Sequence, residues 1–408
     1  MNLKLAQIDQ VKNSSIQITG SKSETNRLLI LQALYPSLQI ENVSNSDDSQ
    51  LMQRALSSSE ELVDIHHAGT AMRFLTAFFA VKKGRKTILT GSERMQERPI
   101  KILVEALQNL GCEISYLKET GYPPIQITGK ELIASEVSLS ADVSSQYISA
   151  LMLIAPSLDK GLKIFLKGKV TSVPYIKMTL SLLEEIGITG TFENNVITIP
   201  SVKKIPQKEV VVESDWSSAS YFYSICAISN KASFELKSYK ENSYQGDAIL
   251  SEIYTHFGVD TTFKDGVILL SKTENFKTKD HVNFDLANSP DIAQTIAVTC
   301  FALHISCKLT GLHTLKIKET DRLVALKTEI EKLGGKVDIT DDSLYLHSSE
   351  SIQKDVTIQT YRDHRMAMAF APLALKTSLI IKKADVVSKS YPDFWNDLNK
   401  VGFIYETL

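Results

Sequence analysis

The sequence contains one structural unit repeated six times, and this repeat constrains the fold more than any other feature. Each copy starts with a few small or polar residues and continues into an apolar, often alanine-rich run. One residue can be chosen to mark the start of each copy. These six residues, called the first-series marks, are Ser23, Thr70, Ser145, Ser218, Asp291 and Arg365. The steps between them are about 47, 75, 73, 73 and 74 residues, which indicates repeated supersecondary units.

A second series of helix starts runs in phase with the first. Amphipathic helices are expected to begin near Ser46, Glu97, Ser172, Gln245, Lys318 and Ser390. Both series place polar groups at helix N-termini, where free backbone N–H groups and the helix dipole attract anions. Lys and Arg side chains cluster at several of these starts. The pattern therefore predicts a protein that binds small, negatively charged molecules.

Short β-rich runs and helix-ending glycines complete each copy, which reads strand–helix–strand–helix–strand–strand. The predicted fold class is therefore α/β. Six copies do not fit comfortably in one open sheet, so two groups of three are expected, with a midpoint near residues 211–215. The N-terminal strand would join the second group. We expect one domain of residues 1–14 and 215–408 and another of residues 15–214.

The composition limits the kinds of molecule that the chain is expected to bind. The net charge is −2, so the chain has no overall positive electrostatic potential that would attract polyanions. Nucleic acid is therefore not an expected partner. The apolar run Met366–Leu375 is too short to span a bilayer, and the N-terminus has no signal-type apolar segment. We expect a cytoplasmic monomer with no membrane partner. Free, buried thiols are expected for the cysteines, which show no CxxC spacing: Cys112, Cys226, Cys300 and Cys307. No metal-ligand cluster and no nucleotide-binding loop is apparent, so no cofactor is expected.

Five motifs concentrate the charged residues. They are GSKSETNR at residues 20–27, AGTAMR at 68–73, RMQERPI at 94–100, KETDR at 318–322 and DHRMAM at 363–368. Together and in this order they resemble the 5-enolpyruvylshikimate-3-phosphate (EPSP) synthase family, over almost the whole chain. The resemblance implies a two-domain inside-out α/β barrel of six βαβαββ repeats, three per domain, with the active site in the cleft between the domains.

The resemblance also implies the activity: transfer of the enolpyruvyl group of phosphoenolpyruvate to the 5-hydroxyl of shikimate 3-phosphate, without metal or organic cofactor. Two phosphates and two carboxylates must be held, which requires many cations and directed donors. The implied ligands of shikimate 3-phosphate are Lys22, Ser23, Arg27, Ser144, Ser145, Gln146, Ser172, Tyr175, Asp291 and Lys318. Those of phosphoenolpyruvate are Lys22, Gly69, Arg98, Gln146, Arg322, Arg365 and Lys389.

Catalytic roles follow from the same resemblance. Asp291 matches the base for the hydroxyl, and Glu319 matches the acid for the methylene carbon. Lys22, Arg322 and Lys389 would stabilise the charge that develops on the departing phosphate. His364 is either a catalytic or proton-relay residue or one that only orients its neighbours.

The sequence leaves two alternative functions to compare with this one. UDP-N-acetylglucosamine enolpyruvyl transferases share the architecture but usually carry a reactive loop cysteine, whereas Cys112 lies at an expected helix end and looks structural. An inactive relative that binds phosphorylated ligands as a regulator is disfavoured by the intact charged residues Lys22, Asp291, Glu319, Arg322 and Lys389. The chain departs from the family at Phe74, where proline is common, and at His67 and Thr314, where asparagine is common. The response to glyphosate, which occupies the phosphoenolpyruvate site in the family, is therefore open.

Overall fold

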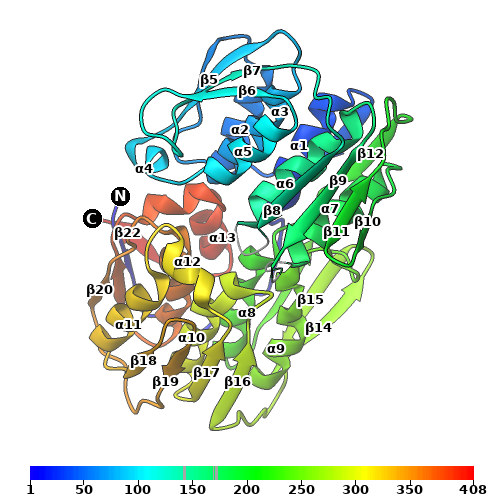
Figure 1. The fold of residues 1–408 in the computed structure, drawn as a ribbon. Helices are drawn as coiled ribbons and strands as arrows, with labels where there is room; N and C mark the ends of the chain where they lie inside the picture. The colour runs from blue at the N-terminus through cyan, green and yellow to red at the C-terminus, as the bar shows by residue number, and fades with distance from the viewer. Residues whose placement is uncertain (141–143, 169, 171–172) are drawn as a thin grey trace. The chain divides into compact units, whose positions relative to one another are not determined.

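The computed structural model describes residues 1–408 apart from 141–143, 169, 171 and 172. The chain divides into two compact units (Figure 1). Unit 1 contains Met1–Thr19 and Glu213–Leu408, and unit 2 contains Gly20–Val212. The chain therefore enters unit 2 and returns to unit 1 through two connections, near residues 19–20 and 212–213.

Unit 2 has two four-stranded sheets and one two-stranded sheet among its described residues. In each four-stranded sheet a parallel pair is extended by two antiparallel strands. The strands in sheet order are β4 (Leu62–Asp64), β5 (Lys86–Thr90), β7 (Ile125–Thr128) and β6 (Glu113–Tyr116), then β10 (Thr191–Glu193), β11 (Val196–Ile199), β9 (Leu162–Lys167) and β8 (Glu136–Ser140), and the parallel pair β12 (Lys208–Val211) and β3 (Leu38–Glu41).

Three helices of unit 2 carry polar starts and long buried runs, and they pack against one another: α1 (Lys22–Leu34), α3 (Gly69–Ala80) and α6 (Ser145–Ile154). Each begins at or next to a first-series mark. The remaining helical segments are α2 (Asp47–Ser57), α4 (Glu93–Gln96), α5 (Lys101–Asn109), η1 (Ala155–Ser157) and α7 (Val173–Glu185). Parallel strands need a crossover, and α3 and α6 supply it for β4–β5 and β8–β9.

Unit 1 has three four-stranded sheets with the same parallel-then-antiparallel pattern. Their strands in sheet order are β14 (Val259–Lys264), β15 (Val267–Lys272), β13 (Ser233–Lys237) and β2 (Ser14–Ile16), then β16 (His281–Asp285), β17 (Ser306–Thr310), β19 (Leu344–Leu346) and β18 (Val337–Ile339), and β20 (Val356–Ile358), β21 (Leu379–Ile381), β1 (Leu3–Leu5) and β22 (Tyr405–Thr407).

The core of unit 1 is built on α8 (Trp216–Ile228), α10 (Ala293–Ala302) and α12 (His364–Phe370). Every residue of α8 and α10 is buried, including the serines of α8 and the threonines of α10, so both helices are enclosed on all sides. Helix α10 packs against both of the others (Figure 1). The other helical segments are η2 (Gly246–Ile249), α9 (Leu250–Ile253), η3 (Tyr254–Phe257), η4 (Pro290–Ile292), η5 (His313–Ile317), α11 (Arg322–Lys332), η6 (Ala371–Leu375), η7 (Ala384–Lys389) and α13 (Phe394–Lys400).

The two connections exchange strands between repeats. Strand β2 precedes α1 in sequence but pairs with β13, whereas β12 precedes α8 but pairs with β3. The β3–β12 sheet keeps only its parallel pair, because the chain passes from α2 directly to β4 without a hairpin. Apart from this shortened sheet, the described residues follow the predicted βαβαββ pattern.

The second series of helices starts later than expected at three places. Helix α5 begins at Lys101 rather than near Glu97, α11 begins at Arg322 rather than near Lys318, and α13 begins at Phe394 rather than near Ser390. Pro99 and Pro392 explain the delay of α5 and α13, because the residue before a proline is disfavoured in helical geometry, and α11 starts only after its N-cap residue, Asp321. Near Gln245 the expected amphipathic helix is a run of short η2, α9 and η3 segments. The helix expected near Ser172 starts at Val173, and Ser172 lies outside the described residues.

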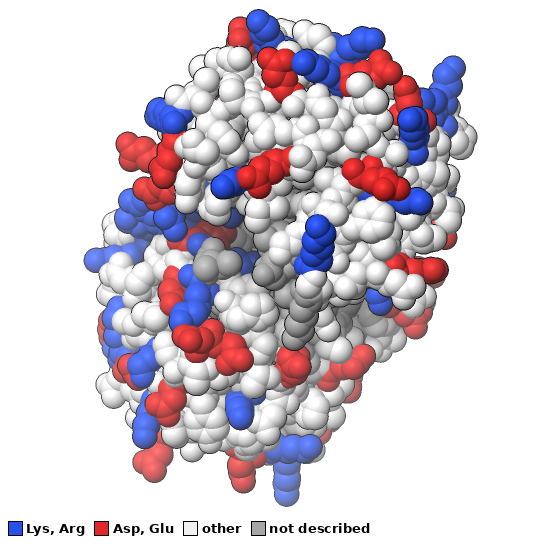
Figure 2. Space-filling model, in the orientation of Figure 1, with Lys and Arg blue, Asp and Glu red and all other residues white. Residues whose placement is uncertain are grey.

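All four cysteines are free and buried, which confirms that prediction. None of the helices in the described part of the chain combines the length and the hydrophobicity that a membrane crossing requires. Acidic and basic side chains are interspersed over the face shown in Figure 2. This mixed pattern agrees with the small net charge.

Candidate active site

In unit 2 most of the predicted site residues lie at the N-terminal ends of the buried helices α1, α3 and α6. Lys22, Ser23 and Arg27 occupy the first two turns of α1. Helix α6 is capped by Ser144, whose Oγ accepts from the Gln146 backbone N–H at 3.3 Å. The Gln146 side chain donates to Thr70 Oγ1 at 3.2 Å, which ties the start of α6 to the start of α3. Ser145 is the first residue of α6.

Gly69 and Arg98 fit against each other. A Cβ atom added to Gly69 would lie 2.4 Å from Arg98 Nη1, so any side chain here would displace the Arg98 guanidinium from this position. Arg73, one turn along α3, is buried and donates to the Gly69 carbonyl at 3.1 Å and to the Pro99 carbonyl at 3.0 Å. Burial, with a further contribution from the Arg98 charge, lowers the pKa of Arg73 to about 10. Arg73 ends the AGTAMR motif, but the motif alone indicates no role for it.

Lys22 faces an acidic residue of α2. Its Nζ lies 3.7 Å from Asp48 Oδ2, and both side chains are largely buried. The adjacent Asp47 lies 3.8 Å from His67 Nε2. The N-cap of α2 is Ser46, so both aspartates stand in its first turn, where the helix dipole favours negative charge.

Arg27 is almost fully buried, with 3% of its surface exposed. Its Nε donates to Thr179 Oγ1 at 2.8 Å, its Nη1 to the Ser23 carbonyl at 2.7 Å and its Nη2 to Ser149 Oγ at 2.9 Å. Tyr175, on α7, turns its half-buried ring toward the same guanidinium. Helices α1, α6 and α7 thus converge on Arg27.

In unit 1 a single buried arginine collects the acidic residues. Arg322, the first residue of α11, donates from Nε to Asp363 Oδ2 at 2.6 Å, from Nη1 to Asp291 Oδ1 at 2.7 Å and from Nη2 to Glu319 Oε2 at 3.0 Å. Burial alone would lower the pKa of Arg322, but the three carboxylates outweigh it and raise the pKa. Arg322 therefore stays charged and fixes the positions of Asp291 and Glu319.

Three cations face the Asp291 carboxylate. Besides Arg322, Lys318 Nζ lies 3.5 Å from Oδ1 and Arg365 Nη2 lies 3.3 Å from Oδ2. Asp291 is in the short helix η4, directly before the buried helix α10. The structure thus brings Asp291, Lys318, Glu319, Arg322 and Arg365 into one cluster.

Two residues that sequence reasoning missed hold Arg365. Its Nη2 donates to Ser217 Oγ at 3.1 Å, and Ser217 Oγ donates to Asp247 Oδ2 at 2.5 Å. Burial, and secondarily the Asp291 charge, raises the pKa of Asp247 to about 6. Burial disfavours a charged Arg365, but Asp291 and its acidic neighbours raise the pKa of this guanidinium. Ser217 stands beside a first-series mark at the start of α8, whereas nothing in the sequence pointed to Asp247.

His364 and Lys389 both contact the turn that precedes α12. His364 is buried at the start of α12, with Nδ1 3.9 Å from Asp363 Oδ1. Lys389 Nζ donates to the Arg362 carbonyl at 2.8 Å. Tyr361 and Arg362 both have positive φ, at 53° and 58°, which is costly for residues other than glycine.

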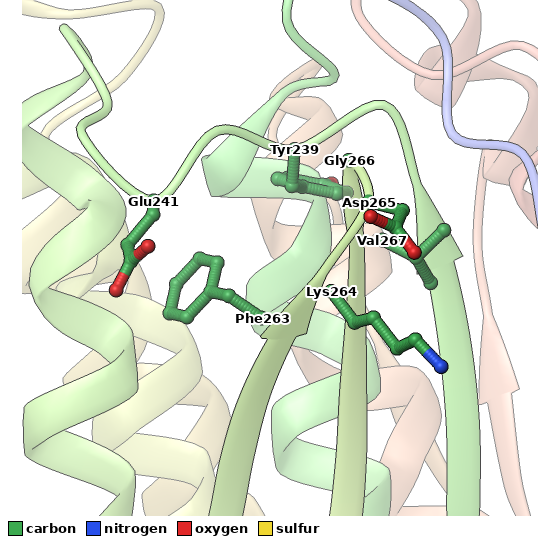
Figure 3. Close-up of a pocket in the computed structure, with 7 residues that line it drawn as sticks. All are labelled: Tyr239, Glu241, Phe263, Lys264, Asp265, Gly266 and Val267. Carbon is green, nitrogen blue, oxygen red and sulfur yellow. The ribbon is translucent and has the colours of Figure 1, made fainter.

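A separate small pocket lies elsewhere in unit 1 (Figure 3). It has a volume of about 130 Å³ and lies where the β14–β15 turn approaches the residues after β13. Its lining residues are Tyr239, Glu241, Phe263, Lys264, Asp265, Gly266 and Val267. It includes none of the predicted site residues. In the part of the chain that the structure describes, no group of three or more His, Cys, Asp or Glu side chains could hold a metal ion.

Comparison with solved structures identifies the class of fold. The chain matches an EPSP synthase from Acinetobacter baumannii with a TM-score of 0.82, at 19% identity and covering 100% of both chains. It also matches the enolpyruvyl transferase NikO from Streptomyces tendae with a TM-score of 0.73, at 13% identity, covering 99% of this chain and 98% of that one. The fold is therefore that of the enolpyruvyl transferases, and the predicted fold class is confirmed.

Sequence comparison then identifies the family. The family described as EPSP synthase (3-phosphoshikimate 1-carboxyvinyltransferase) matches residues 54–398. A 3-phosphoshikimate 1-carboxyvinyltransferase from Bacteroides fragilis (strain YCH46) is 45% identical over 407 residues, covering 99% of this chain and 98% of the relative. One from Mannheimia haemolytica is 34% identical, covering 98% and 99%. The chain belongs to the EPSP synthase family, as the resemblance indicated.

Proposed function

We propose that this chain is an enzyme that transfers the enolpyruvyl group of phosphoenolpyruvate to the 5-hydroxyl of shikimate 3-phosphate and releases inorganic phosphate, a step of the shikimate pathway to the aromatic amino acids. The observation that carries the proposal is full-length identity of 45% with a 3-phosphoshikimate 1-carboxyvinyltransferase. The cluster around Asp291 and Arg322 supports it, because it supplies both acid–base groups and cations.

The chemistry is an addition followed by an elimination. The 5-hydroxyl oxygen bonds to C2 of the enol phosphate, its proton passes to a base, and C3 gains a proton. The C2–O bond to phosphate then breaks, C3 loses a proton and the double bond is restored. One base and one acid suffice for these steps. We assign them to Asp291 and Glu319, with Lys22 assisting the departing phosphate and His364 as the proposed relay or orienting residue.

The ion pairs of the cluster explain how substrate could activate Asp291. In the structure the Asp291 carboxylate is engaged by Arg322, Lys318 and Arg365. A phosphate or carboxylate competes for the same donors, since guanidinium groups bind oxyanions through paired N–H donors. Each cation that turns to the ligand leaves Asp291 freer to accept the hydroxyl proton. Glu319 is suited to proton delivery because its side chain is 35% exposed.

The substrate ligands stay as the resemblance implied them. For shikimate 3-phosphate we propose Lys22, Ser23, Arg27, Ser144, Ser145, Gln146, Ser172, Tyr175, Asp291 and Lys318. For phosphoenolpyruvate we propose Lys22, Gly69, Arg98, Gln146, Arg322, Arg365 and Lys389. The closeness of Arg98 to Gly69 supports the second set, because it places a guanidinium beside a helix N-terminus, where anions bind well.

One assay separates this function from the two rivals. Purified protein is given phosphoenolpyruvate with shikimate 3-phosphate, with UDP-N-acetylglucosamine, or alone, and phosphate release is followed. We expect release only with shikimate 3-phosphate and its loss in Asp291→Ala. Release with the nucleotide sugar would make the chain a UDP-N-acetylglucosamine enolpyruvyl transferase. Tight binding of both substrates without release would make it an inactive, ligand-binding relative.

We also propose that the two units are the two predicted domains and that substrate draws them together. The proposed phosphoenolpyruvate ligands come from both units, and all the charged ones are cations. Shikimate 3-phosphate should therefore reduce the radius of gyration in small-angle scattering and strengthen phosphoenolpyruvate binding. If the radius and the affinity are both unchanged, this part of the proposal is wrong.

The remaining expectations also stay proposals. We propose a cytoplasmic monomer without metal or organic cofactor. Both substrates are phosphorylated anions, which cross membranes poorly, and the proposed addition and elimination need only acid–base groups and cations. Light scattering after size exclusion tests the monomer, and turnover in excess chelator tests the independence from metal.

A further inference from the structure

The guanidinium of Arg27 lies between two aromatic rings. Its Cζ is 5.3 Å from the centre of the Phe74 ring and 5.7 Å from the centre of the Tyr175 ring. Phe74 is in the middle of α3 and Tyr175 is near the start of α7, so the rings come from different helices. Both distances are within the range of cation–π attraction.

No carboxylate lies within ion-pair distance of Arg27 in the part of the chain that the structure describes. The acceptors that it does have, Thr179, Ser149 and the Ser23 carbonyl, are all neutral. Burial lowers the pKa of Arg27 to about 10, with Tyr175 and Glu24 partly opposing that shift, so the side chain is charged at neutral pH. A buried charge without an opposite charge is costly, and the two ring faces are what this site offers in compensation.

The hydrogen bonds leave part of Arg27 available to a ligand. A guanidinium has five N–H donors, and three are used by the neutral acceptors. The other two can reach an oxyanion only if the plane of the group is held in the right orientation. The two rings, one on each helix, restrict rotation of that plane.

We propose that Phe74 is a positioning residue for shikimate 3-phosphate: its ring holds the Arg27 guanidinium so that the two remaining N–H groups meet an anionic or hydroxyl group of the substrate. The inference rests on the proposed function, in which Arg27 is a ligand. Phe74 is only 1% exposed, so it acts through Arg27 rather than by touching the substrate.

Helix α3 supplies a matched control. Phe79 is on the same helix and is completely buried, but its ring faces Arg85, with the Cζ atom 4.6 Å from the ring centre. Arg85 is not among the proposed ligands. Phe74→Leu and Phe79→Leu each remove one buried ring from α3, so a general loss of core packing would affect both variants alike.

The test compares binding and kinetics in the two variants. In Phe74→Leu we expect the Kd and KM of shikimate 3-phosphate to rise about tenfold, the order of one desolvated cation–π contact. The KM of phosphoenolpyruvate and kcat should change far less. Phe79→Leu should keep the wild-type Kd, and Phe74→Tyr, which retains the ring, should recover most of the affinity. Wild-type affinity in Phe74→Leu, or equal losses in both leucine variants, would overturn the proposal.

A second measurement does not depend on the substrate. The side-chain Nε–H signal of Arg27, assigned by its loss in Arg27→Lys, reports motion of the guanidinium directly. We expect faster rotation and faster hydrogen exchange in Phe74→Leu than in Phe79→Leu. Unchanged rotation and exchange in Phe74→Leu would overturn the positioning role. Failure of the wild-type protein to bind shikimate 3-phosphate would instead overturn the proposed function.

Discussion

Two buried arginines, one in each unit, solve the same physical problem in opposite ways. Arg322 in unit 1 is surrounded by the carboxylates of Asp291, Glu319 and Asp363. Arg27 in unit 2 is held by neutral oxygens and lies between the Phe74 and Tyr175 rings. The charge of Arg322 is balanced within the protein, whereas that of Arg27 has no ion-pair partner in the described residues.

The difference matches the roles proposed for the two groups of residues. A cation without an ion pair favours an anionic ligand, because the ligand supplies the missing opposite charge. A cation that orders three carboxylates instead fixes the acid and the base and gives up its donors only when a stronger competitor binds. Unit 2 would therefore contribute mainly to affinity, and unit 1 to affinity and chemistry together.

The largest effect should come from removing each arginine. Arg322→Met leaves three carboxylates close together without their shared cation, so the folded state should lose about 3–5 kcal/mol at pH 7. Arg27→Met leaves no unbalanced charge and should cost about 1 kcal/mol or less. Urea unfolding of both variants measures the difference.

Acidification provides the control for this pair. Lowering the pH protonates the carboxylates around the missing Arg322, so Arg322→Met should recover stability relative to wild type, whereas Arg27→Met should not. Equal losses for the two arginines at neutral pH would remove the distinction between the two sites.

The second-largest effect should be the loss of turnover when the carboxylates held by Arg322 are replaced. Asp291→Ala and Glu319→Gln should each lower kcat by about 100-fold or more if they transfer protons. In Glu319→Gln the exchange of C3 protons with solvent should also collapse. Arg27→Lys, by comparison, should raise the Kd of shikimate 3-phosphate and leave kcat closer to wild type. Near-normal turnover in both carboxylate variants would show that the acid and base lie elsewhere.

A smaller effect is expected on the pH dependence of stability, and it depends on the acidic residue Asp247 in unit 1. The pKa of Asp247 is raised from 3.8 to about 6, so between these values the folded protein holds a proton that the unfolded chain releases. Stability should therefore fall as the pH rises through this window. Asp247→Asn should remove the cost of ionising this carboxyl group in the folded protein and stabilise the protein by about 1 kcal/mol at pH 7.5. The expected gain is this small because the side chain is partly exposed, so solvent screens its charge. Asp9→Asn, at an exposed position of the same unit, is the control. Equal pH profiles for the two variants would contradict the prediction.

The smallest effect concerns the inhibitor of the family. Phe74 stands where proline is common, and its buried ring packs in α3, which begins at Gly69. A small difference at that start would affect glyphosate more than the shorter phosphoenolpyruvate. At saturating shikimate 3-phosphate we expect Phe74→Pro to be a few-fold more sensitive to glyphosate than wild type. An equal or weaker inhibition of Phe74→Pro would refute this.

Much of the fold was predictable because periodic patterns determine it. The first-series marks fall at the starts of six buried helices, and the strands between them follow the βαβαββ order. The shortened β3–β12 sheet was not predictable, since a missing hairpin leaves no positive signal in the sequence. The exchange of β2 and β12 was also missed, because strand pairing across two hundred residues depends on the return of the chain.

The sequence predicts those residues of the candidate site that lie in motifs. It does not predict the residues that act on them from outside the motifs. Asp291, Glu319, Arg322 and Arg365 lie together, as expected for residues that share a ligand. Asp247 holds Arg365 through Ser217, but it follows an ordinary Gln-Gly pair that carries no motif. Phe74 was noticed only as a departure from the family, and its contact with Arg27 depends on the packing of α1 against α3.

The position of β1 has a consequence for the order of folding during synthesis. Strand β1, at residues Leu3–Leu5, is the inner strand between β21 and β22, and β22 ends at Thr407. Strand β1 must therefore remain without its partners until β21 and β22 have been made. Unit 2 is continuous from Gly20 to Val212 and can close its last sheet as soon as β12 appears. Unit 2 should thus fold first on the ribosome, whereas unit 1, although begun earlier, is completed only after β21 and β22 have been made.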